Sequence, residues 1–181
     1  MTVTATQPAP RSTAASDWLR ELVDVRNEYE ELLCWPVLLE VTNRRLIMPT
    51  GTTLDAVVMP AALGEKVLAE LRIAMLDCPV IMEPDGSWIF ATDPVGAPHP
   101  AMPPELISAQ VRTLPAGSQV VLPASPHLCG VGRSWVTPCR RQSLAPWHAV
   151  IATGRRIIAR GFDGNLSYKA DVPALYRPAA A

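Results

Sequence analysis

The chain has 181 residues, 49% hydrophobic and 18% charged, a composition expected for one globular domain with a substantial buried core. Its 16 basic and 17 acidic side chains give a net charge of −1, which excludes a protein held to nucleic acid by overall charge. Residues 1–132 carry 8 basic and 15 acidic side chains, whereas residues 133–181 carry 8 basic and 2 acidic ones. The function therefore has to accommodate an acidic region and a basic region.

Residues 1–15 are small or polar and contain no aromatic side chain, which predicts a disordered tail. We expect a single domain over residues 16–160 and a loop-rich C-terminal extension over residues 161–181. The domain begins with a predicted helix capped by Ser16 or Asp17. Apolar residues spaced by three and four give this helix one buried face: Trp18, Leu22, Val25, Tyr29 and Leu32. Its outer face is acidic.

Short β-rich runs follow the helix. Residues 36–41 and 44–48 form a predicted hairpin, and residues 54–59 form a third strand. Pro60 suits the first turn of a helix. The apolar positions of that helix recur every four residues: Leu63, Val67, Leu71 and Met75.

The second half of the chain continues the mixture of strands and helices. Residues 79–83 and 87–91 flank a Pro-Asp-Gly turn, and the five prolines of residues 94–104 predict an exposed loop. Further elements are expected as a short helix at 105–109, strands at 111–114, 118–122 and 133–137, and a helix at 145–153 stopped by Gly154. This order predicts an α+β fold in which helices pack on a mixed β-sheet.

The most informative segment is residues 117–136, where a glycine-led strand ends in Ser125-Pro126-His127 and a glycine loop leads into an aromatic strand. Together with Cys34-Trp35-Pro36-Val37 and residues 84–90, it resembles the primase–polymerase domain of the archaeo-eukaryotic primase superfamily. The form it resembles is the N-terminal domain of bifunctional DNA primase/polymerases, in a degenerate, actinobacterial-type version. The resemblance covers about residues 20–137 and implies a primase–polymerase-like fold.

The resemblance implies that His127, in the Ser-x-His motif, lies near the phosphates of an incoming nucleotide. Ser125 and His127 both offer hydrogen-bond donors to phosphate oxygens. Arg133, on the next predicted strand, completes the candidate phosphate-binding set. The alternative interpretation of His127 is a histidine in a Pro/Gly loop that caps the end of a strand.

The sequence departs from the family where metal ions are needed. The family's polymerase chemistry requires an Asp-x-Asp pair just before a proline, because two cations bridge the primer hydroxyl and the triphosphate. Anchored on Pro60, these positions are Val57 and Met59, which do not bind metal. Asp55 faces the same side of the strand and is a possible remnant carboxylate, or else a strand-edge or capping residue. Mg²⁺ or Mn²⁺ is expected only if Asp55 is functional.

A second candidate surface is a series of arginines near Trp135 and Trp147. Its members are Arg133, Arg140, Arg141, Arg155, Arg156 and Arg160. Arginines and aromatic rings together suit phosphate contact and base stacking, so we assign Arg140, Arg141, Arg155 and Arg156 as candidate nucleic-acid contacts. The alternatives are a solvated basic face, or a face that docks on the acidic first helix of the same or a neighbouring chain.

We therefore expect a degenerate primase/polymerase-like domain that binds nucleotide or single-stranded nucleic acid without polymerising. One alternative is a regulatory or assembly protein that associates through its acidic and basic ends, and another is an active nucleotidyltransferase with displaced carboxylates. Zinc is not expected, because the available cysteines and histidines lack compact ligand spacing. A basic start followed by an apolar run is absent, so we expect a cytoplasmic protein that does not contact membranes.

Overall fold

The structure, a computed structural model, describes residues 14–76, 78–96, 99–127, 132–137 and 144–162. Within these ranges the chain is a mixed α+β fold, which confirms the predicted class. The helices are α1 (Ala14–Leu33), α2 (Ala61–Ile73), α3 (Pro104–Ser108) and α4 (Trp147–Ala159). None of these described helices combines the length and apolar character that crossing a bilayer demands.

The strands form two sheets. The smaller sheet is antiparallel, in the order β1 (Leu38–Glu40), β2 (Arg45–Pro49) and β7 (Gln119–Val121). The six-stranded sheet has the order β6 (Arg112–Thr113), β3 (Asp55–Pro60), β5 (Ser87–Asp93), β4 (Val80–Met82) and β8 (Ser134–Trp135). Its sixth strand, β9 (Ala145–Pro146), pairs in parallel with the end of β5, and the other pairs are antiparallel.

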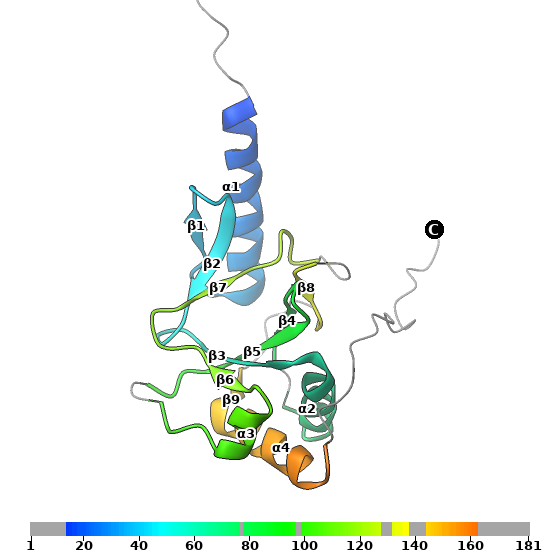
Figure 1. Cartoon of the computed structure of the whole chain (residues 1–181). Coiled ribbons are helices and arrows are strands. Elements are labelled where there is room, and N and C mark those ends of the chain that lie inside the picture. Colours follow the sequence, from blue (N-terminus) through cyan, green and yellow to red (C-terminus); the bar gives the residue numbers. More distant parts are fainter. Residues whose placement is uncertain (1–13, 77, 97–98, 128–131, 138–143, 163–181) are drawn as a thin grey trace, which may run out of the picture.

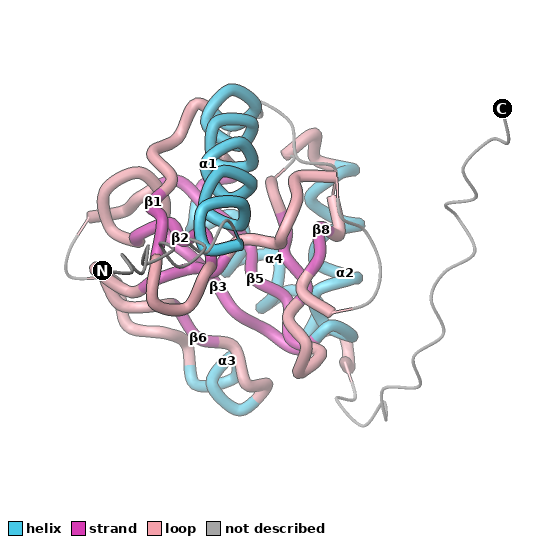
Figure 2. Tube along the Cα trace, turned by 90° about the horizontal axis from the view of Figure 1, so that it is seen from above, coloured by secondary structure: helices cyan, strands magenta, loops and turns pink. Residues whose placement is uncertain are grey.

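The six-stranded sheet separates two helical layers. Helix α1 and the small sheet lie on one side, and α2, α3 and α4 lie on the other (Figure 1). Seen from the α1 end, α1 crosses over the strands with α2 and α4 behind them (Figure 2). We call the sheet surface toward α1 the upper face and the surface toward α2 and α4 the lower face.

Strand alternation divides the core between these two faces. On β3, Val57 and Met59 pack on the lower face, and Ala56 and Val58 pack on the upper face. Helix α2 supplies its four-residue apolar stripe to the lower core. Gly64 lets this helix approach the sheet closely, since an added Cβ would lie 2.8 Å from the Trp88 ring. Tyr29 and Leu33 of α1 close the upper core.

Several details differ from the sequence predictions, among them residues 145–146, which were predicted as helix and form strand β9. Helix α1 begins at Ala14, so Ser16 and Asp17 lie inside it and do not cap it. Helix α2 ends before Met75, which is 90% exposed. Helix α4 continues past Gly154, where the missing side chain makes room for Leu106 of α3.

The remaining difference concerns the proline-rich segment after β5. It is a loop, as predicted, but it is not exposed throughout, because its His99 side chain is only 15% exposed. The predicted tail and C-terminal extension lie almost wholly outside the described residues, so those domain boundaries stay predictions.

Candidate functional site

Asp55 is a buried carboxylate at the start of β3. Alternation along the strand points it to the lower face with Val57 and Met59, and its exposed fraction is 0%. The backbone N–H of Val95 donates to Asp55 Oδ2 at 2.8 Å. His99 Nε2 lies 2.9 Å from the same oxygen. Asp55 therefore holds the proline-rich loop against the sheet.

Several polar side-chain atoms around Asp55 have no hydrogen-bond partner among the described residues. Thr92 lies directly opposite Asp55 in the β3–β5 pairing and is also fully buried. Within the described residues, Asp55 Oδ1, Thr92 Oγ1 and His99 Nε2 have no hydrogen-bond partner. The contact of Nε2 with Asp55 is at ion-pair distance but lacks hydrogen-bond alignment. The His99 ring stacks on Trp147, with centroids 6.4 Å apart. We call Asp55, Thr92 and His99 the buried polar cluster.

This arrangement does not fit the pair of cations that polymerase chemistry requires. Val57 and Met59, at the two expected ligand positions, are buried apolar residues. Asp55 is a single carboxylate, and one of its oxygens is already bound to the loop. Magnesium takes several oxygen ligands together with water. In the part of the chain that the structure describes, no three His, Cys, Asp or Glu side chains converge as a metal site. The described residues at this position therefore do not fit a metal-dependent step.

His127 lies on the α1 side of the molecule. Its Nε2 is 2.8 Å from Glu28 Oε1 of α1, and its backbone N–H donates to Ser125 Oγ at 3.2 Å. The His127 side chain is 72% exposed and that of Glu28 is 41% exposed. The same segment is anchored at Pro123, whose carbonyl accepts a hydrogen bond from the buried Tyr29 hydroxyl. Ser125 and His127 thus lie together on an anchored surface segment.

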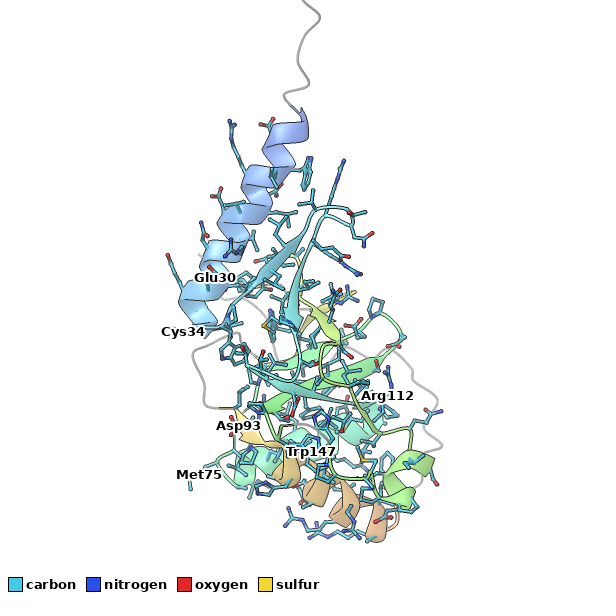
Figure 3. The ribbon with its side chains drawn as sticks, turned by 90° about the vertical axis from the view of Figure 1, so that its left-hand side faces the viewer. Glu30, Cys34, Met75, Asp93, Arg112 and Trp147 are labelled. Atoms are coloured by element: carbon cyan, nitrogen blue, oxygen red, sulfur yellow. The ribbon has the colours of Figure 1, made fainter. Side chains whose placement is uncertain are left out.

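The sheet separates the two ends of the predicted nucleotide site. Asp55 points to the lower face and contacts His99, whose ring packs on Trp147 of the lower core. His127 contacts α1, which belongs to the upper core. Trp147 lies at the start of α4, beneath the strands (Figure 3). The two residues therefore do not share one metal–nucleotide site.

The described arginines of the predicted series all contact carboxylates. Arg133 forms a bidentate pair with Glu83, with Nε 2.9 Å from Oε1. On the lower side, Arg155 pairs with Glu105 at 2.6 Å, and Arg156 and Arg160 reach Glu70. Arg140 and Arg141 lie outside the described residues. Arg155 and Arg156 are across the sheet from His127, so they do not extend its surface.

Local contacts also change the acidity of two glutamates. The backbone N–H of Glu105 and the Arg155 guanidinium hold the pKa of the Glu105 carboxyl below its usual value. The Arg26 guanidinium and the backbone N–H of Val37 do the same for the pKa of Glu30 on α1. Both carboxylates are therefore stabilised in their charged form.

A groove crosses the outer surface of α4. Its volume is about 590 Å³, and it runs between the end of α2, α3 and the exposed side of α4. Apolar lining comes from Leu76, Ala149, Ala152 and Ile158. Arg155 and Arg156 contribute positive charge, and Glu105, which pairs with Arg155, contributes negative charge. We call this feature the α4 groove.

Sequence reasoning missed His99 as a partner of Asp55. Its only signal was a histidine in a proline-rich loop, 44 positions after Asp55. It also missed the link from the Tyr29 hydroxyl to Pro123 and to Trp135, whose Nε1 donates to that hydroxyl at 3.0 Å. Comparisons with protein families, curated proteins and solved structures gave no match to this chain.

Proposed function

We propose that this chain is a primase–polymerase-like domain that binds nucleotide or single-stranded nucleic acid and does not polymerise. The observation that carries the proposal is the separation of Asp55 from His127 by the six-stranded sheet. Nucleotide transfer needs carboxylate-bound cations beside the triphosphate. An exposed Ser-x-His segment needs no such partner to contact a phosphate.

The Ser125–His127 segment supports phosphate binding on the condition that Glu28 leaves the His127 imidazole. The His127–Glu28 pair is largely exposed, and exposed pairs of this kind stabilise a protein by only about 0–1 kcal/mol. A phosphate can therefore displace Glu28 from the imidazole at small cost. The Glu28 carboxylate also repels the arriving anion, so it limits affinity while it is charged.

Fluorescence polarisation with labelled oligo-dT and with a fluorescent nucleotide tests this proposal at low salt. We expect His127→Ala to abolish binding, and Glu28→Gln to tighten it by several-fold because the repulsion disappears. Glu31→Gln removes the same charge from an exposed position on the same helix and serves as the matched control. Absence of binding in the wild type and in Glu28→Gln would overturn the proposal.

Primer extension with Mn²⁺ tests the non-catalytic part separately. We expect no incorporation by the wild-type chain. Incorporation that disappears in Asp55→Asn would show that the buried carboxylate serves nucleotide transfer, and it would overturn this part of the proposal while leaving binding intact.

A second candidate function is assembly through the charged ends of the chain. The observation that favours it is the exposure of the arginines on and after α4. Arg155, Arg156 and Arg160 contact carboxylates, yet each of their side chains remains more than half exposed. Helix α1, at the other end of the molecule, has six acidic and two basic residues. Sedimentation velocity over a concentration series tests this candidate, with association expected to weaken as salt screens the charges.

A further inference from the structure

A row of carboxylates on α1 lies beside the Ser125–His127 segment. Glu21, Asp24, Glu28 and Glu31 follow one another at spacings of three and four residues, so they share one face of the helix. Glu28 contacts the His127 imidazole at 2.8 Å, and the carboxylates before and after it each lie about one turn away. We call these four residues the acidic stripe.

The acidic stripe keeps most of its negative charge in the folded chain. Its other three members, Glu21, Asp24 and Glu31, are exposed, and among the described residues they form no ion pair. Three nearby arginines already pair with carboxylates outside the stripe: Arg20 with Asp17, Arg26 with Glu30, and Arg45 with Glu40. Arg44 lies over the Trp18 ring, about 15 Å along the helix axis from Glu28. The stripe is therefore not neutralised by its neighbours.

The Ser125–His127 segment offers little positive charge to oppose the stripe. Ser125 supplies a neutral hydroxyl and His127 a single imidazole. Arg133, the third member of the candidate phosphate-binding set, holds Glu83 through Nε and Nη2, so its charge is compensated. A protein that follows a single strand instead uses a positively charged groove along several phosphates. Within the described residues, this segment has donors for one phosphate group only.

Repulsion by the acidic stripe increases with the number of phosphates in the ligand. The stripe extends over about 15 Å of the helix axis. Charges are screened only beyond about 10 Å at 0.1 M salt, so a phosphate near His127 interacts with several carboxylates. A mononucleotide brings one phosphate group, which the imidazole can bind. An oligonucleotide brings additional phosphates that find no donor and meet the same carboxylates.

We infer that the Ser125–His127 segment binds a mononucleotide, and that the acidic stripe selects against single-stranded nucleic acid. This choice of ligand rests on the proposed function, because it names the ligand class of the same segment. Glu28 controls access of any phosphate to His127. The other three carboxylates of the stripe determine the selection by ligand length.

Competition against a fluorescent nucleotide at low salt tests this selection. The competitors are dTMP and 5′-phosphorylated oligo-dT of increasing length, which share the same terminal phosphate. For the wild type we expect oligo-dT to compete at least about fivefold more weakly than dTMP, because each added phosphate adds repulsion. The difference is expected to shrink as salt is added, because salt screens the stripe. A protein that binds the nucleic-acid backbone through basic groups shows the opposite pattern, a loss of oligonucleotide affinity with salt.

The double substitution E21Q/D24N neutralises two members of the stripe and keeps the contact between Glu28 and His127. We expect oligo-dT to bind this variant about fivefold more tightly than it binds the wild type. The affinity for dTMP is expected to change by less than about twofold, since neither substituted residue contacts His127. Glu31 is kept, because Glu31→Gln is the control for Glu28→Gln.

The matched control is E65Q/D93N. It makes the same two kinds of substitution, with the same change in net charge, at exposed positions on α2 and at the end of β5. We expect it to bind dTMP and oligo-dT as the wild type does. An equal gain of oligo-dT binding in both variants overturns the inference, because net charge and not the stripe then sets the selection.

Further outcomes separate this inference from the proposed function. Oligo-dT that competes more strongly than dTMP, and more strongly with length, overturns the inference and leaves nucleic-acid binding by the segment standing. E21Q/D24N that binds both competitors like the wild type also overturns it, because the stripe then makes no selection. Failure of every probe to bind the wild type and Glu28→Gln overturns the proposed function and the inference with it.

Discussion

The two faces of the six-stranded sheet differ in how many of their buried polar groups lack a hydrogen-bond partner. On the upper face, the Tyr29 hydroxyl donates to the Pro123 carbonyl and accepts from Trp135 Nε1, both at 3.0 Å. On the lower face, Asp55 Oδ1, Thr92 Oγ1 and Trp88 Nε1 have no hydrogen-bond partner within the described residues. A satisfied buried network adds stability, whereas an unsatisfied group costs its desolvation.

This difference shows which contacts hold each of the two candidate functional segments in place. The Tyr29 network, which consists of the hydrogen bonds of the Tyr29 hydroxyl with Pro123 and Trp135, anchors the segment that leads to the exposed His127. The buried polar cluster holds the proline-rich loop against the sheet through Asp55 and His99. Several of its polar atoms have no hydrogen-bond partner among the described residues. Unsatisfied groups in a native protein call for an explanation beyond stability. The upper face thus supports a surface segment, whereas the lower face buries the Asp55 carboxyl group.

The largest expected effect comes from His99→Ala. The substitution removes a largely buried ring that stacks on Trp147 and contacts Asp55 Oδ2, and truncation of a buried aromatic ring to alanine costs about 3–5 kcal/mol. We expect a loss near the lower end, about 3 kcal/mol, since the Val95 N–H still binds Asp55. Urea denaturation measures the change in the free energy of unfolding. A loss below about 1 kcal/mol would mean that the lower face does not depend on this pair.

A double-mutant cycle provides the control for that prediction. In an Asp55→Asn background the carboxylate that His99 contacts is absent, so His99→Ala is expected to cost less than in the wild type. Additive losses would show that His99 acts through its stacking on Trp147 and not through Asp55.

The next largest effect is expected on the upper face, from Tyr29→Phe. The substitution preserves the ring and removes the hydroxyl, which leaves the buried Trp135 N–H and the Pro123 carbonyl without this partner. We expect a loss of about 2 kcal/mol, within the range for unsatisfied buried groups. Thermal or urea unfolding measures it. If Tyr29→Phe leaves the free energy of unfolding unchanged, the hydrogen-bonded hydroxyl adds no stability, and the two faces do not differ in this respect.

Thr92→Val is the matched change on the lower face and is expected to have the opposite sign. Valine has nearly the shape of threonine, and the Thr92 hydroxyl has no partner within the described residues. Replacing an unsatisfied buried hydroxyl by a methyl group is expected to leave stability unchanged or raise it by up to about 1 kcal/mol. Destabilisation by Thr92→Val would show that the hydroxyl is satisfied in solution, so that the lower face resembles the upper one.

The elements of this fold were predictable because local pattern determines them. The four-residue apolar spacing of Leu63, Val67 and Leu71 predicted α2, and the β-rich run of residues 54–59 predicted β3. Errors arose where packing overrides local preference. Gly154 is a helix breaker by propensity, yet its lack of a side chain accommodates Leu106 from α3.

The candidate site was less predictable because its contacts join distant parts of the chain. The contact of Ser125 with His127 is local, since the two residues belong to one Ser-x-His motif. The contact of His127 with Glu28 spans 99 residues, so no sequence period encodes it. Likewise, the arginine series contains no acid in sequence, but the fold brings Glu70 and Glu105 to it. Charge patterning along a chain therefore overstates the free positive surface of the folded protein.

The smallest expected effect is a pH dependence at the base of α1. Arg26 and the Val37 N–H lower the pKa of Glu30 from its usual value near 4.5. A carboxylate with a lowered pKa in the folded state stabilises the protein above its unfolded pKa and loses that contribution as pH falls through the folded value. We therefore expect Glu30→Gln to reduce stability at neutral pH by under about 1 kcal/mol, because the pair is partly exposed. The difference from the wild type should shrink below pH 4.5. Urea unfolding across this range measures it, with the exposed Glu31→Gln as control. If both variants show the same pH profile, the attachment of α1 depends on the Tyr29 network and apolar packing alone, and the upper face has no acid-sensitive component.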